Sequence, residues 1–210
     1  HYAARPTHID DLGESVRAIT PGGLWESRRL PASGAGPSPD RLLLGSEGAL
    51  GVITQAWLRV VPRPTHKHSA TVRFPDFGAG CEAIRAILQM GLLPSNCRLI
   101  EGAEAPGPDG RPLLVIGFEG GVELSGLLEA SLTTCRECGG EVQPAGSGER
   151  EWRGAFLQAP YLRDTLVCLG IMAETFETAV TWDRLPNLIE LVKQTAAQAT
   201  EEVCGHPGRV

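Results

Sequence analysis

Three glycines within seven positions, Gly45, Gly48 and Gly51, constrain this chain more than any other feature. They stand between the apolar run 42–44 and the strand-like run 52–54, so the sequence predicts a strand, a glycine-rich turn and a second strand. Glycine is needed where the backbone takes a positive φ or approaches another group closely, and a tight turn needs only one. The spacing is therefore typical of two arrangements: a main-chain surface under a flat cofactor, or a β-corner that binds nothing.

The net charge and the hydropathy of the chain argue against a nucleic-acid partner and against a membrane-spanning helix. The 210 residues carry a net charge of −6, so we do not expect a nucleic-acid-binding protein, which should show a basic surplus. No run approaches the ~18 consecutive apolar residues of a membrane-spanning helix. Only Lys67 and Lys193 among the 19 basic residues are lysine, which we interpret as the coding bias of a GC-rich genome.

Six cysteines are scattered along the chain without the spacing of a disulfide framework. Cys135 and Cys138 form a C-x-x-C pair, but no second pair of ligands stands at metal spacing. We therefore predict reduced thiols in a cytoplasmic protein, with no metal site and no redox centre.

The first part of the chain is rich in loops as far as Pro62–Pro64, where we expect a domain boundary. Residues 16–26 surround the turn Pro21-Gly22-Gly23, which predicts a β-hairpin. The proline, glycine and serine segment 31–39 predicts a surface loop before the strand at 41–44.

The second part alternates regularly between strand and helix patterns. Asp76 is expected to cap its first helix, and Gly139-Gly140 to end its second. We expect strands at 70–74, 97–100, 113–118 and 174–183, with helices at 77–91, 124–135 and 185–203. This order predicts an α+β fold in which a ferredoxin-like antiparallel sheet carries helices on one face.

Two arginines are candidate binding residues. Arg98 lies in SNCRLIEG on a short predicted strand, where an ion pair with Glu101 is the plainer interpretation. Arg163 lies in PYLRD, where it could equally form a surface pair with Asp164.

Other polar residues do not form a recognisable catalytic set. Glu174 and Glu177 are three apart on a predicted strand and so face opposite sides of the sheet. His66 and His68 share one face of a strand, but no carboxylate or cysteine stands near them in sequence, so we expect them to be exposed. No Ser-His-Asp or Cys-His arrangement is present in the sequence pattern.

The segment Gly45–Thr54, GSEGALGVIT, matches GSEGTLGVIT at nine of ten positions. The latter closes the FAD-binding domain of flavoproteins of the vanillyl-alcohol-oxidase/p-cresol-methylhydroxylase type, which this chain resembles. Ala49 replaces the usual threonine and removes one hydroxyl. The resemblance implies FAD as cofactor, bound by Gly45, Ser46, Glu47, Gly48, Ala49, Leu50, Gly51, Val52 and Ile53.

Three further motifs resemble those of alkyldihydroxyacetonephosphate synthases and bacterial relatives, in the same order. They are S-x-x-R-L at 95–99, P-Y-x-R-D at 160–164 and E-T-F-E-T-A-x-x-W-D-R at 174–184. This resemblance implies that Arg163 and Arg98 contact a small anionic substrate, a phosphate or carboxylate. It also implies chemistry through a flavin N5 adduct that exchanges acyl for alkyl.

Two alternatives stay open at this point. The first is an FAD-linked D-2-hydroxyacid dehydrogenase, whose relatives share the glycine motif but the later motifs less well. The second is a non-enzymatic, cap-like interaction module in which the glycine turn is vestigial.

The resemblance also implies that the chain is an internal fragment. Residues 1–64 would be the C-terminal part of a two-subdomain FAD-binding domain, and residues 65–210 most of a substrate (cap) domain. The P-x-G-G-G-T-like pyrophosphate loop and the H-H-G or H-H-H segment of the family are absent, so the catalytic residues are unknown and expected downstream of Val210. A homodimer is left open.

Overall fold

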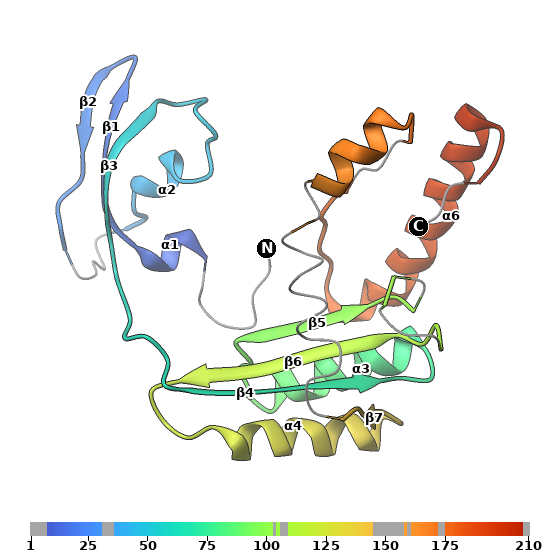
Figure 1. Cartoon of the computed structure of the whole chain (residues 1–210). Coiled ribbons are helices and arrows are strands. Elements are labelled where there is room, and N and C mark those ends of the chain that lie inside the picture. The colour runs from blue at the N-terminus through green and yellow to red at the C-terminus, as the bar shows by residue number, and fades with distance from the viewer. Residues whose placement is uncertain are drawn as a thin grey trace.

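The fold is α+β, as predicted, with two antiparallel sheets and accompanying helices (Figure 1). It is known from a computed structural model that describes residues 8–30, 36–102, 104–105, 109–144, 158, 161–171 and 175–207. In Figure 1 the first sheet lies apart from the second, and a single connection after β3 joins them.

The first sheet has the strand order β2-β1-β3, with β1 at Gly13–Thr20, β2 at Gly23–Glu26 and β3 at Val52–Leu58. The hairpin predicted about Pro21-Gly22-Gly23 is confirmed, because Thr20 pairs with Gly23 across it. The Thr20 hydroxyl donates to the Gly23 carbonyl over 2.9 Å. Gly23 has a φ of 112°, a value that side chains disfavour.

Two short helices, α1 (Ile9–Leu12) and α2 (Asp40–Leu43), accompany this sheet. The strand predicted at 41–44 is wrong, because these residues belong to α2 and its C-cap. Consecutive leucines carry no periodicity that separates helix from strand. Leu43 is buried against Val16 and Ala18 of β1, whereas Leu42 is exposed.

The second sheet has the order β5-β6-β4-β7. Its elements are β4 (His66–Arg73), α3 (Phe77–Gln89), β5 (Asn96–Ile100), β6 (Leu113–Gly120), α4 (Ser125–Glu137) and β7 (Glu141–Val142). The chain order β-α-β-β-α-β with this strand order is that of a ferredoxin-like unit. The strands predicted at 70–74, 97–100 and 113–118 and both intervening helices are therefore present.

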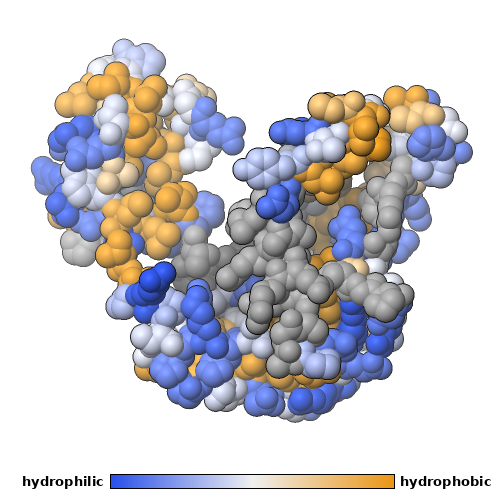
Figure 2. Space-filling view, in the orientation of Figure 1, coloured by the Kyte–Doolittle hydropathy of each residue, from blue (hydrophilic) through white to orange (hydrophobic). Residues whose placement is uncertain are grey.

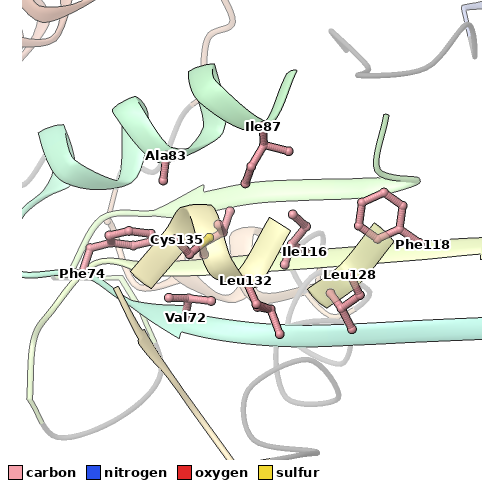
Figure 3. Packing of buried hydrophobic residues seen from close by; sticks show 10 residues of the cluster. Val72, Phe74, Ala83, Ile87, Ile116, Phe118, Leu128, Leu132 and Cys135 are labelled. Atoms are coloured by element: carbon pink, nitrogen blue, oxygen red, sulfur yellow. The ribbon is translucent and has the colours of Figure 1, made fainter. Parts of the chain in front are cut away.

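The main core lies between this sheet and the two helices α3 and α4 (Figure 3). Phe74, Ile87 and Ile116 are fully buried there, together with Cys135 from α4. Asp76 caps α3 as predicted, since its carboxylate accepts the N–H of Ala79 over 2.9 Å. Both helices cover the same face of the sheet because residues from each join one cluster.

The C-terminal region contains helical residues 161–168, a 3-10 turn η1 (Trp182–Arg184) and the helix α6 (Leu185–Cys204). The strand predicted at 174–183 is wrong for its described residues, because 175–181 have no regular secondary structure and Trp182 and Asp183 lie in η1. Glu174 lies outside the described residues. A strand requires a neighbouring strand for its backbone N–H and C=O groups, and in the described part of the chain no β-strand pairs with residues 175–181.

The predicted helix at 185–203 is confirmed, but none of its residues is buried. The Lys193 ammonium on α6 lies 3.4 Å from a carboxylate oxygen of Glu101, beyond the end of β5. Figure 2 shows apolar side chains at the surface of the first sheet and of the C-terminal helices. Within the part of the chain that the structure describes, no helix is long and apolar enough to cross a membrane.

Candidate functional site

The glycine-rich segment forms a turn of left-handed residues between α2 and β3. Gly45 and Gly48 have φ values of 79° and 87°, and Glu47, with φ 49°, is the one non-glycine residue with positive φ among the described residues. The N–H of Ser46 donates to the Leu43 carbonyl over 3.1 Å, and the N–H of Ala49 donates to the Ser46 carbonyl over 2.9 Å. The predicted strand–turn–strand is therefore a helix–turn–strand.

The glycines divide into two kinds. A Cβ placed on Gly45 or Gly48 would meet nothing within 4 Å, so their main chain borders open space. A Cβ on Gly51 would lie 2.6 Å from the Ile19 carbonyl oxygen, which only a glycine accommodates. Gly51 therefore allows β3 to approach β1, whereas Gly45 and Gly48 leave an uncovered main-chain surface. Such a surface fits the planar ring system of FAD, which a side chain at either position would obstruct.

A polar cluster fixes α2 and therefore the start of this turn. The Asp40 carboxylate accepts hydrogen bonds from the Ser27 hydroxyl over 2.7 Å and from the Trp25 indole N–H over 3.4 Å. Asp40 is only 8 % exposed, so both partners compensate the burial of its carboxylate. It also borders a hollow of about 870 Å³ that extends to Leu44, at the foot of the turn, and does not include residues 45–53.

The two candidate arginines lie on different elements. Arg98 is an exposed residue of β5, opposite Val115 of β6. Arg163 is an exposed residue within the helical residues 161–168. Glu101, the sequence-predicted partner of Arg98, pairs with Lys193. Both arginines lie at the surface, which their predicted role requires.

Sequence reasoning missed a cluster at one end of the second sheet. The prediction that His66 and His68 are exposed, for want of a nearby carboxylate, is wrong, because both are half-buried and approach Glu123. His66 Nδ1 lies 3.2 Å from Glu123 Oε2, and His68 Nε2 lies 2.7 Å from Glu123 Oε1. Backbone pairing of His66 with Gly120 brings the segment after β6 alongside the two histidines. That β4–β6 pairing is the signal that could have revealed the cluster.

Glu123 is held as a carboxylate at the start of α4. Its Oε1 accepts the N–H groups of Ser125, over 2.8 Å, and Leu124, over 3.0 Å. These hydrogen bonds, chiefly the one from Ser125, lower the pKa of Glu123 to about 2. The group is therefore ionised at neutral pH and directed toward the histidines.

All six cysteines are free thiols. Burial raises the pKa of Cys135 to about 12 and that of Cys97 to about 11. Both thiols are therefore protonated at neutral pH, and neither is a reactive thiolate.

The fold and the glycine turn together define an α+β protein with an exposed main-chain surface suited to a flat cofactor. The chain belongs to the FAD-linked oxidases: residues 63–208 match the family described as "FAD linked oxidases, C-terminal domain". This match includes the whole ferredoxin-like unit and α6.

Known proteins resemble the chain over most of its length. Alkyldihydroxyacetonephosphate synthase of Caenorhabditis elegans is 25% identical over 89% of this chain and 37% of its own length. A solved structure of alkyldihydroxyacetonephosphate synthase superposes with a TM-score of 0.76 at 25% identity, over 92% of this chain and 40% of that one. The mitochondrial D-lactate dehydrogenase (cytochrome) of Arabidopsis thaliana is 33% identical over 41% of this chain and 16% of its own length. The chain thus spans about two fifths of the synthases it matches.

Proposed function

We propose that this chain is part of an FAD-dependent enzyme with alkyldihydroxyacetonephosphate synthase activity. The observation that carries the proposal is the similarity to the synthases, which extends over both sheets, whereas the D-lactate dehydrogenase matches 41% of the chain. The order of the three later motifs, at 95–99, 160–164 and 174–184, supports the same assignment.

We propose a domain boundary at residue 64. Residues 1–64 complete the FAD-binding domain, and residues 65–210 form the substrate domain. The separate cores of the two sheets support this division, since the cluster around Val16 shares no residue with the cluster around Phe74.

The turn 45–53 is our proposed FAD contact. Open space beside Gly45 and Gly48 allows the main chain to lie against the cofactor, and the N–H and C=O groups there offer hydrogen bonds without side-chain obstruction. FAD, once bound, supplies the electron chemistry, while the protein supplies position and electrostatics.

Arg163 and Arg98 are our proposed substrate contacts. A guanidinium binds a phosphate or carboxylate through two parallel hydrogen bonds and thereby orients it. The substrate we propose is accordingly a small molecule with an anionic head, a phosphate or a carboxylate; for the proposed synthase activity it would be an acyl-dihydroxyacetone phosphate. We propose the bacterial cytoplasm as the compartment, a reducing environment in which cysteines stay as thiols.

The alternative is an FAD-linked D-2-hydroxyacid dehydrogenase. Its support is the match to D-lactate dehydrogenase, which is shorter than the match to the synthases. A non-enzymatic module is a weaker candidate. In a turn that binds nothing, no ligand would require glycine at positions 45 and 48, which border open space.

The test uses the full-length protein. Flavin content is measured first by absorbance, and exchange of the acyl group for a labelled fatty alcohol is then compared with oxidation of D-lactate by a dye acceptor. The proposal expects bound FAD and exchange without dye reduction. Dye reduction without exchange would establish the dehydrogenase, and absence of flavin would leave the interaction module.

A further inference from the structure

Two imidazoles and a carboxylate converge at one end of the second sheet. One ligand atom from each of His66, His68 and Glu123 lies within 4.8 Å of the other two. His68 is the most enclosed of the three side chains, with 29% of its surface exposed against 40% for His66 and 58% for Glu123. The cluster contains no residue of the glycine turn and neither candidate arginine. A metal site there is therefore independent of the proposed function.

The backbone holds these groups in place. His66 and His68 are two residues apart on β4 and so project from the same face, with Lys67 on the other face paired to Glu119 over 2.8 Å. All eight residues of β4 pair with β6, which rigidifies the strand. Glu123 is fixed by the N–H groups at the start of α4. Ligands on paired strands and helix starts are preorganised.

The contact between His68 and Glu123 is not a satisfied hydrogen bond. His68 Nε2 lies 2.7 Å from Glu123 Oε1, yet this buried nitrogen has no aligned hydrogen-bond partner. The atoms are close enough for an ion to join them, since two ligands of a tetrahedral zinc ion stand ~3.4 Å apart when each bond is ~2.1 Å. The contacts of 2.7 Å and 3.2 Å are both shorter than that spacing, so binding of an ion requires the side chains to move apart.

We propose that His66, His68 and Glu123 form a binding site for a divalent transition-metal ion, with Zn²⁺ as the preferred occupant. Two imidazole nitrogens favour zinc, cobalt or nickel over magnesium and calcium, which prefer oxygen ligands. Three protein ligands leave a fourth position of the ion for water or an external group. The ion would join β4 to the segment before α4.

The test is metal binding to the full-length protein after treatment with a chelator and removal of that chelator. Co²⁺ is titrated by absorbance and Zn²⁺ by calorimetry, for wild type, His68→Asn and Glu123→Gln. The amide oxygen introduced by Glu123→Gln would still accept the N–H groups of Leu124 and Ser125, so this variant should fold like wild type. His206→Asn, which changes an exposed histidine elsewhere, is the matched control.

We expect both site variants to bind one equivalent of metal less than wild type. If they still bind that equivalent, its affinity should fall by more than the ~10–100-fold that is typical for loss of an outer-shell partner. The control should match wild type, and the Co²⁺ spectrum of the lost equivalent should show no sulfur-to-metal charge transfer. Equal binding by wild type and both variants would overturn the proposal. So would a thiolate spectrum for that equivalent, which would assign the ion to cysteines.

Discussion

The backbone of Gly51 lies directly against the carbonyl of Ile19, so that a Cβ on Gly51 would stand 2.6 Å from that oxygen. This contact occurs where β3 begins to pair with β1, at the Val52–Ile19 pair. The glycine turn is thus attached to the first sheet at its last glycine.

Replacing Gly51 with alanine should destabilise the first sheet by about 1–3 kcal/mol, the usual cost of overpacking a close contact. Urea denaturation measures the change. Gly121→Ala is the control, because a Cβ there meets nothing within 4 Å, and it should alter the stability by no more than about 0.5 kcal/mol. Equal effects of the two substitutions would contradict the close contact.

In the full-length protein, Gly48→Val should remove FAD and leave the second sheet folded. A branched side chain disfavours the φ of 87° and occupies the space proposed for the cofactor. Gly91→Val is a matched control, since Gly91 has a φ of 76° and equally open surroundings after α3. Flavin absorbance after purification should fall for the first variant only; a fully yellow Gly48→Val protein would refute the role of the turn.

The 210-residue chain by itself should not retain FAD. Its turn supplies one side of the proposed site, while the pyrophosphate-binding loop of the family is not part of this sequence. Titration of FAD against the chain should leave flavin fluorescence nearly unchanged. Tight stoichiometric quenching would show that the turn is sufficient for binding.

Arg163→Lys in the full-length protein should weaken apparent substrate binding by about 1–3 kcal/mol, the scale of a hydrogen bond to a charged group, and leave flavin content unchanged. Lysine keeps the charge but loses the planar pair of donors. Arg85→Lys on α3, where Arg85 pairs with Glu82 over 3.2 Å, is the control. If Arg163 only forms a surface pair with Asp164, kcat/KM stays at the wild-type value and stability changes by at most ~1 kcal/mol.

Arg111 should make stability depend on acid pH. Its guanidinium contacts Asp109 over 2.9 Å and Glu141 over 2.8 Å, and these hydrogen bonds lower the pKa of both carboxyl groups from 3.8 and 4.5. A lowered folded-state pKa stabilises the fold above the unfolded-state value, and the gain is lost as pH falls through the folded-state pKa.

Urea midpoints of wild type and Arg111→Gln should therefore differ well above pH 4.5 and converge well below pH 3.8. Arg85→Gln, which removes one exposed pair on α3, should change the midpoint little at any pH. A difference between wild type and Arg111→Gln that persists in acid would exclude the carboxylates as its cause.

The ferredoxin-like unit was predictable from local signals. Asp76 caps α3, and the continuous apolar run 113–118 lies in β6, the most buried of the described strands. The positive φ values at Gly45 and Gly48 were likewise expected from residue type. The FAD and substrate contacts remain predictions.

The errors arose where local pattern and tertiary context diverge. Leu42–Leu44 carry no period, and only the burial of Leu43 against β1 distinguishes the helix. The alternation of Phe176, Val180 and Trp182 resembles a strand, yet all three are exposed. The pairing of His66 with Glu123 spans 57 positions and depends on the β4–β6 register, which spacing alone does not encode.

The exposed apolar side chains of the C-terminal region have a consequence for behaviour in solution. Leu191 and Val203 on this helix are 56% and 84% exposed, and Leu169 and Phe176 before it are 69% and 67% exposed. Apolar side chains that gather at a surface favour self-association in water, and Figure 2 shows apolar side chains gathered on the C-terminal helices. A preparation of this 210-residue chain should therefore form concentration-dependent aggregates, which light scattering across a dilution series would detect.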